Sequence, residues 1–279
     1  MALLNYRKIM VAAGLSVVAL FFNSCQKELK QKEKPLYDVF LLAGQSNTLS
    51  GYRLNPGVDL VVTGIKQLGR FNEDNYQIIE ATEPLQNHTP NDSCIGFAIT
   101  FAKLYANSYL QKGRQVLIIP CGANGSGFLN NHWNKGNDYY KDAIERVNKV
   151  LDSFPGSELK AVLWHQGEAD FTFGENYYKA LDNMIASMRI SFHQSNRDSI
   201  PFIAGGFVPY WVDMNPRFRI VDSVLRATPS RVAVTGFADP RVPFIIVKPD
   251  NSAEPIHFDA NGQREMGKRY FAEYQRLVK

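Results

Sequence analysis

Short apolar runs alternate with longer amphipathic segments along the chain from Tyr37 onward. The short runs are rich in Val, Ile, Leu and Phe, which is typical of strands buried on both faces of a sheet. They predict strands over residues 38–42, 115–119, 160–164, 201–204 and 231–235. In the longer segments apolar residues recur every three or four positions, which predicts helices over residues 95–111, 139–154, 176–192, 217–227 and 261–278. This alternation predicts an α/β fold, a three-layer α/β/α sandwich with a mostly parallel central sheet.

Two stretches do not follow this alternation. Residues 52–93 contain short apolar pieces that are separated by Gly, Asn and Asp. An unstructured loop of that length is unusual in a compact domain, so we expect small strands and turns that cover one edge of the sheet. Residues 237–256 contain several prolines, which exclude a long helix. Because no internal repeat is visible, residues 37–279 are expected to form one domain.

The amino terminus has the features of a secretory signal. A basic start is followed by an almost wholly apolar stretch over residues 9–22, which is too short to span a bilayer comfortably. The small residues before Cys25 resemble a bacterial lipobox, in which the cysteine is acylated after cleavage. The sequence therefore predicts a signal peptide over residues 1–24, a lipid anchor on Cys25 and a charged tether over residues 25–36. Such a lipoprotein is expected on the outer membrane, facing either the periplasm or the cell surface. An uncleaved anchor or a buried helix is the alternative.

Composition limits the classes of function. The chain has 279 residues, of which 45% are hydrophobic and 21% charged, as expected for a globular protein with a core. Its formal net charge of +4 is small for this length and gives no reason to expect nucleic acid as a partner. Cys94 and Cys121 remain once Cys25 is set aside, and they can either pair or stay as buried thiols. Nothing in the sequence indicates an oligomeric state.

Ser46 is the first candidate for chemistry. It follows the first predicted strand, in the small-residue turn Ala-Gly-Gln-Ser-Asn over residues 43–47. Ligands of open parallel sheets bind outside the carboxyl ends of strands, so a serine at this position is well placed to act as a nucleophile. The alternative is that Ser46 only caps the following turn.

His257 and Glu254 lie at the other end of the chain, just before the last predicted helix. A serine hydroxyl is a poor nucleophile at neutral pH, so it needs a base that titrates at about pH 6.5 and a carboxylate that holds this base in the right tautomer. His257 and Glu254 supply both groups from one tight turn. A structural histidine that caps the helix is the alternative reading of this turn.

Two further polar blocks follow predicted strands. Residues 164–170 (Trp-His-Gln-Gly-Glu-Ala-Asp) gather an amide and carboxylates at one strand end, where burial is costly unless these groups are hydrogen-bonded or functional. Residues 121–127 (Cys-Gly-Ala-Asn-Gly-Ser-Gly) are glycine-rich, which lets backbone N–H groups approach a ligand as an oxyanion hole requires. This second block lacks the lysine of a phosphate-binding loop. Helix capping is the alternative for the first block, and an ordinary glycine-rich loop is the alternative for the second.

These blocks and their order resemble the carbohydrate-esterase branch of the SGNH/GDSL hydrolase superfamily, which includes sialate O-acetylesterases and acetylxylan esterases. The resemblance rests on Gly-Gln-Ser-Asn over residues 44–47, on the two blocks described above and on the C-terminal His257, and it covers essentially all of residues 37–279. It implies the flavodoxin-like α/β/α fold of SGNH hydrolases. It also implies a serine esterase that removes O-acetyl groups from carbohydrates, with an O-acetylated glycan as substrate and no cofactor.

The resemblance further implies roles for individual residues. Ser46 matches the nucleophile of the superfamily, and His257 matches the general base that later acts as an acid. The negative oxygen of the intermediate is expected to be bound by the backbone N–H groups of Ser46 and Gly125 and by the side-chain amide of Gln166.

The carboxylate that orients His257 stays open at this point. The superfamily usually has Asp three residues before the histidine, where this chain has Glu254. Members of the carbohydrate-esterase branch can instead use the glutamate of the Gln-Gly-Glu block, which is Glu168 here. Both carboxylates are candidates, and Glu168 is preferred because Glu254 is longer than the usual Asp.

Other residues of these blocks are expected to bind the substrate or to support the site: Gln45, Asn47, Asn124 and His165. Trp133 and Trp211 are candidates for platforms on which a sugar stacks, although burial is the more frequent fate of such side chains. The remaining histidines, at positions 88, 132 and 193, show no metal-ligand spacing, so a reaction without a metal is expected.

Two other functions are kept as alternatives. One is a different acyl reaction on the same scaffold, as in a lipase, a thioesterase or an acetyltransferase. The other is a glycan-binding lipoprotein without catalytic activity. The presence of Ser46, Gly125, Gln166 and His257 argues against a binding-only protein, and only Glu254 in place of Asp favours it.

Overall fold

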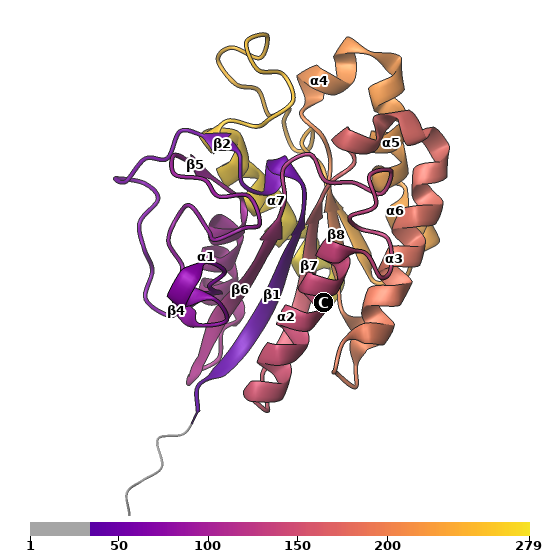
Figure 1. The fold of residues 1–279 in the computed structure, drawn as a ribbon. Helices are drawn as coiled ribbons and strands as arrows, with labels where there is room; N and C mark the ends of the chain where they lie inside the picture. Colours follow the sequence, from indigo (N-terminus) through magenta and orange to yellow (C-terminus); the bar gives the residue numbers. More distant parts are fainter. Residues whose placement is uncertain (1–33) are drawn as a thin grey trace, which may run out of the picture. The chain divides into compact units, whose positions relative to one another are not determined.

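The structure, a computed structural model, describes residues 34–279, which form one compact unit (Figure 1). The predicted signal peptide, Cys25 and most of the predicted tether fall within residues 1–33, outside the described residues, so these features stay predictions. Among the helices of residues 34–279, none has the length and apolar character needed to cross a membrane.

A 7-stranded sheet forms the centre of the molecule. From one edge to the other its strands are β4 (Ile78–Glu80), β3 (Ile65–Leu68), β6 (Arg114–Gly122), β1 (Leu36–Gly44), β7 (Glu158–His165), β8 (Phe202–Gly205) and β9 (Thr235–Ala238). All neighbours pair in parallel except β3 and β4, which are antiparallel. A separate 2-stranded antiparallel sheet joins β2 (Gly51–Tyr52) to β5 (Cys94–Ile95).

Helices cover both faces of this sheet (Figure 1). They are α1 (Ala98–Tyr109), α2 (Asp138–Ser153), α3 (Tyr177–Ser191), α4 (Pro209–Met214), α5 (Pro216–Arg226), α6 (Thr228–Arg231) and α7 (Ala260–Val278), with short 3₁₀ helices η1 (Ser46–Thr48), η2 (Asn72–Asp74), η3 (Glu168–Asn176) and η4 (Arg197–Ser199). α1 and α7 pack against each other on one face, and α2 lies on the opposite face. The predicted α/β/α sandwich with a mostly parallel sheet is therefore confirmed.

The last helix illustrates why the sequence folds this way. In α7 the residues Met266, Tyr270 and Tyr274 recur at helical spacing, and all of them are buried. The ring of Tyr270 stacks on Phe97 at a centroid distance of 4.1 Å. The side chain of Asp259 accepts a hydrogen bond of 2.7 Å from the Gly262 N–H and so caps the amino end of the helix.

Two sequence predictions need correction. The strand predicted over residues 231–235 is wrong, because Thr228–Arg231 forms the short helix α6, with a proline in its first turn, and the strand β9 begins only at Thr235. The helix predicted from residue 95 begins at Ala98, because Cys94 and Ile95 form the strand β5, which pairs with β2. In addition, residues 52–93 do more than cover the sheet edge, since β3 and β4 extend the central sheet itself.

Candidate active site

The carboxyl ends of three neighbouring strands meet at one edge of the sheet. Gly44 at the end of β1 is in register with Gly122 of β6 and with His165 of β7. Gly44 has a φ of +130°, and a Cβ atom there would lie 2.0 Å from the His165 carbonyl oxygen. Only glycine fits at this position, which lets the chain turn sharply into η1. Ser46 is the first residue of η1, so the turn places its hydroxyl just beyond the sheet.

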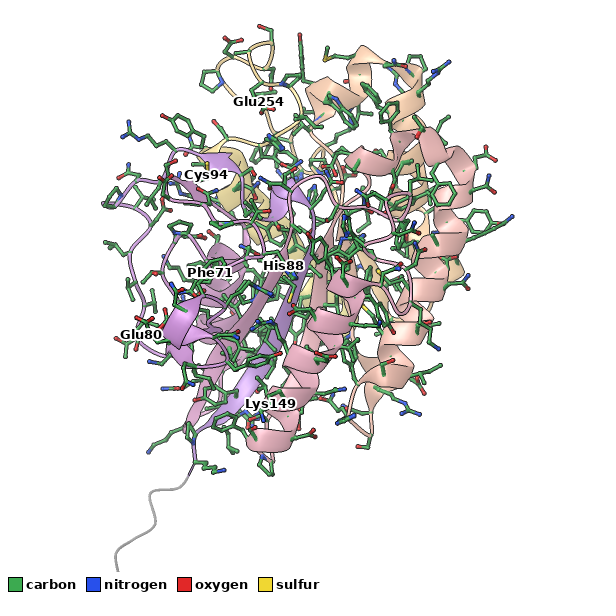
Figure 2. The ribbon with its side chains drawn as sticks, in the orientation of Figure 1. Phe71, Glu80, His88, Cys94, Lys149 and Glu254 are labelled. Carbon is green, nitrogen blue, oxygen red and sulfur yellow. The ribbon has the colours of Figure 1, made fainter. Side chains whose placement is uncertain are left out.

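Ser46, His257 and Glu254 lie in one row, in which each side chain contacts the next. The Ser46 Oγ atom is 2.8 Å from Nε2 of His257. On the other side of the imidazole ring, Nδ1 is 3.1 Å from Oε1 of Glu254. Glu254 lies in the loop before α7, which rises over the strand ends (Figure 2). This row has the geometry of a nucleophile, a base and a carboxylate that orients the base.

Lys248 holds the carboxylate of this row, and the sequence analysis missed it. Its Nζ atom lies 3.2 Å from Oε2 of Glu254 and donates a hydrogen bond of 2.7 Å to the His257 carbonyl oxygen. The same Oε2 atom accepts a hydrogen bond of 3.1 Å from the His257 backbone N–H. One oxygen of Glu254 is thus anchored to its own loop, and the other faces the imidazole. Lys248 lies in a proline-rich stretch without periodicity, so no pattern in the sequence indicates this contact.

Asn47 ties the histidine loop to the serine turn. Its Nδ2 atom donates hydrogen bonds to the Ile256 carbonyl oxygen at 3.0 Å and to Oε1 of Glu168 at 2.6 Å. Its Oδ1 atom accepts a hydrogen bond of 3.1 Å from the Phe258 N–H. Asn47 is 0% exposed, so it contacts both neighbours of His257 and is not accessible to a substrate. Of the two roles that the sequence allowed for Asn47, the structure supports positioning.

Glu168 and His165 form a buried pair behind the site. Oε1 of Glu168 lies 3.4 Å from Nε2 of His165, and both side chains are fully buried. Nδ1 of His165 is 3.2 Å from the Tyr270 hydroxyl. Burial alone would raise the pKa of Glu168, but His165 and the Asn47 amide beside it hold this pKa below its ordinary value. Glu254 contacts the imidazole of His257, whereas Glu168 contacts Asn47 and His165, which reverses the preference drawn from the sequence.

Gln166 and Gln45 are part of the same buried scaffold. Nε2 of Gln166 faces three acceptors, which are Oε1 of Gln45 at 3.2 Å, the Ser126 carbonyl oxygen at 3.2 Å and Oδ2 of Asp170 at 2.9 Å. Oε1 of Gln45 also accepts the N–H groups of Gly167 and Ala169. Both glutamines are at most 2% exposed. The Gln166 amide is therefore already engaged by protein acceptors, which does not suit the oxyanion role expected from the sequence. Gln45 likewise positions the serine turn.

The glycine-rich loop over residues 121–127 lies at the carboxyl end of β6, as the sequence predicts. Asp170 accepts the backbone N–H groups of Phe128 at 2.7 Å and Leu129 at 3.0 Å, which holds this loop against the end of β7. Burial raises the pKa of Asp170. Gly125 is exposed and has a φ of +66°, a conformation that favours glycine. Within residues 34–279, the backbone N–H groups of Ser46 and Gly125 donate to no protein acceptor, so both are available to a bound oxygen.

The aromatic side chains near the site differ from the expectation. Trp133 is 0% exposed and Trp211 is 6% exposed, so neither is a platform for a sugar. Asn124 is exposed beside Gly125, as a substrate-binding residue would be. Cys94 and Cys121 are free thiols, and burial raises the pKa of Cys121 to about 12.

Cavities help to locate where a ligand fits. A cavity of about 280 Å³ lies beside the row and is lined by His257, Glu254 and Tyr52, among others. A larger cavity of about 470 Å³ is lined mainly by α3 and α5 and includes none of Ser46, His257 and Glu254.

A family model and a plant protein match this chain in sequence. The model of the family "Carbohydrate esterase, sialic acid-specific acetylesterase" matches residues 36–276. A probable carbohydrate esterase of Arabidopsis thaliana is 30% identical over 142 residues, which are 46% of this chain and 51% of the relative, so the match spans about half of that protein.

Solved structures share the fold. The crystal structure of NanS has a TM-score of 0.74 at 18% identity and covers 88% of this chain and 98% of its own. The structure of an Arabidopsis thaliana protein has a TM-score of 0.70 at 22% identity and covers 87% of this chain and 99% of its own. A carbohydrate acetylesterase from Xanthomonas citri has a TM-score of 0.60 at 15% identity, with coverages of 86% and 56%.

Proposed function

The chain belongs to the sialic acid-specific acetylesterase family of carbohydrate esterases, and from this premise we propose that it is a serine hydrolase that removes O-acetyl groups from carbohydrates. The observation that carries the proposal is the row of Ser46, His257 and Glu254, with contacts of 2.8 and 3.1 Å, at the carboxyl edge of the parallel sheet. A binding protein has no need for a hydroxyl, an imidazole and a carboxylate in line.

The first half of the reaction forms an acetyl-enzyme. His257 Nε2 takes the proton of the Ser46 hydroxyl as Oγ attacks the acetyl carbonyl carbon. The carbonyl oxygen becomes negative and is bound by the N–H groups of Ser46 and Gly125. Glu254 stabilises the protonated imidazole and keeps Nε2 directed at Ser46. When the tetrahedral intermediate collapses, the bond to the sugar oxygen breaks, and His257 gives this oxygen its proton.

The second half releases acetate. A water molecule takes the place of the sugar, and His257 removes its proton as it attacks the acetyl group on Ser46. The same N–H groups bind the second oxyanion. Collapse of this intermediate frees acetate, and the proton on His257 returns to Ser46. The chain, the substrate and one water molecule account for every atom of the reaction.

Substitution of the row tests the proposal. Ser46→Ala and His257→Ala are each expected to lower kcat for acetate release from a generic acetyl ester by at least about 10⁴-fold, because the members of such a row act as a unit. Ser223→Ala, on the exposed side of α5, is the matched control and should retain full activity. Thermal unfolding shows whether each variant is folded. Retention of most of the activity by Ser46→Ala would overturn the proposal.

A further inference from the structure

If the proposed function holds, the leaving sugar lies near His257, and a cavity of about 280 Å³ borders this residue. It is lined by Ser50, Tyr52, Lys248, Asp250, Glu254, His257, Phe258 and Asp259. In the proposed reaction His257 passes a proton to the departing sugar oxygen, so the sugar must lie against this imidazole. The volume is near the lower end of the range of small-molecule sites, which suits a single sugar ring.

Charge is distributed unevenly around this cavity. Three of the cavity residues are acidic, Asp250, Glu254 and Asp259, and Lys248 is the one lysine or arginine among them. Lys248 is already paired with Glu254 and donates a hydrogen bond to the His257 carbonyl oxygen. It cannot bind a substrate carboxylate without giving up these contacts.

The two remaining carboxylates are fixed in place. Asp250 accepts hydrogen bonds from the hydroxyl and the N–H of Ser252 and from the N–H of Ala253. The hydrogen bond from Ser252 lowers the pKa of Asp250 below its ordinary value, so this group is ionised at neutral pH. Asp259 caps α7 through its bond to the Gly262 N–H. The three acidic residues and the one lysine of the cavity therefore sum to a net charge of about two negative units.

Tyr52 gives the cavity an apolar wall. Its side chain belongs to β2 at the rim of the site and is 62% exposed, in contrast to the buried Trp133 and Trp211. An exposed aromatic ring buries little of its own surface in the free protein, so it gains apolar contact when the flat face of a sugar ring covers it.

We propose that this subsite accepts an uncharged O-acetylated sugar, such as a neutral hexose, pentose or N-acetylhexosamine, and disfavours a sugar that carries a carboxylate. The preference arises from repulsion between the substrate carboxylate and the acidic lining. Repulsion between a substrate carboxylate and two net negative charges at roughly 8 Å, in a water-like dielectric, lowers kcat/KM by about fivefold at low salt. This proposal rests on the proposed function and concerns the substrate class of the same site.

A matched pair of substrates tests the proposal. Acetate release is measured from the methyl glycoside of an O-acetylated sialic acid and from the same compound with its carboxyl group methylated, with an acetylated methyl glucoside as neutral reference. The methylated compound is expected to have a kcat/KM about fivefold higher, and the ratio should shrink as ionic strength rises. Asp250→Asn keeps the acceptor for Ser252 but removes a charge, so it should bring the ratio closer to one.

Asp152→Asn is the control for this change of charge. Asp152 is an exposed residue of the last turn of α2, near Lys149, at the end of the molecule opposite Glu254 (Figure 2). It should leave the ratio unchanged.

The outcomes separate the two proposals. Equal or faster cleavage of the carboxylate form, or a ratio that Asp250→Asn does not alter, would overturn the neutral subsite while leaving the esterase intact. Hydrolysis of a generic acetyl ester without hydrolysis of any of the acetylated sugars would also overturn the neutral subsite and leave the esterase intact. If no acetyl ester of any kind is hydrolysed, the proposed function itself fails.

Discussion

The end of β7 and the loop before α7 are the two polar regions of the site, and they differ in how they use their charges. At the end of β7, residues His165, Gln166 and Glu168 are at most 2% exposed, and most of their polar atoms face other protein groups. In the loop before α7, the side chains of Glu254 and His257 are 49% and 27% exposed. The first region is buried scaffold, and the second is accessible to solvent.

The difference follows from the cost of burying charge. A carboxylate removed from water must have fixed partners, and such partners prevent it from exchanging protons or admitting a ligand. The block at the end of β7 looks more catalytic in the sequence because it gathers more polar residues. Its function in the structure is to hold Asn47 and the glycine-rich loop in position. In the proposed reaction, proton transfer falls to His257 in the turn before α7, which solvent can reach.

Removing the charge of Glu254 should have the largest effect. Glu254→Gln is expected to lower kcat by about 10³- to 10⁴-fold with the fold retained, because the imidazolium loses the carboxylate that stabilises it. Steady-state acetate release and thermal unfolding measure the two quantities. Glu168→Gln should lower kcat far less, and Glu145→Gln on the exposed face of α2 should have no effect. A greater loss for Glu168→Gln than for Glu254→Gln would reverse the comparison.

Removing the charge of Glu168 should instead affect stability. Glu168→Gln is expected to lower the free energy of unfolding by about 2 kcal/mol at neutral pH, the cost of a charged hydrogen bond. The pKa of Glu168 is lowered in the folded state, so its contribution is complete above the ordinary carboxyl pKa and is lost as the pH falls below it. The gap between wild type and variant should therefore narrow in acid. Denaturant unfolding as a function of pH measures it, and a gap that widens in acid would contradict the assignment.

Lys248 should have the smallest effect of the three. Lys248→Met is expected to lower kcat about tenfold, because Glu254 loses a charged hydrogen bond that holds it toward His257. Lys248→Arg should restore part of the activity, and Lys268→Met, on the exposed face of α7, serves as the control. In a Glu254→Gln background the Lys248→Met change should add little, since Lys248 acts through Glu254. Full additivity of the two substitutions would show that Lys248 acts independently.

Much of the fold could be predicted because buried parallel strands and amphipathic helices leave clear periodic patterns. The central strands and α2, α3, α5 and α7 lie within a few residues of their predicted positions. The failures occur where the pattern is ambiguous. The apolar residues over 231–235 predict a strand there, whereas pairing with β8 fixes the start of β9 at Thr235. Likewise, β3 and β4 are too short to show a period.

The site could be predicted at the level of blocks, but less well at the level of individual roles. Ser46 was identifiable because it follows a strand, and His257 because such a serine needs an imidazole base with a carboxylate beside it. The choice between Glu254 and Glu168 depends on a few ångströms of loop path, which no spacing encodes. Engagement of the Gln166 amide by Asp170, 4 residues along, and the contact of Lys248 with Glu254, 6 residues along, depend on the path of irregular loops, which no periodicity indicates.

Covalent labelling of the nucleophile tests the central claim most directly. A fluorophosphonate reacts with a serine only where a neighbouring base activates the hydroxyl, and peptide mapping by mass spectrometry then locates the adduct. We expect one adduct per chain, on Ser46, in the wild-type protein and in Glu168→Gln, with slow or no labelling in His257→Ala and Glu254→Gln. An adduct on another residue, or acetate release by a protein whose Ser46 stays unlabelled, would contradict the account.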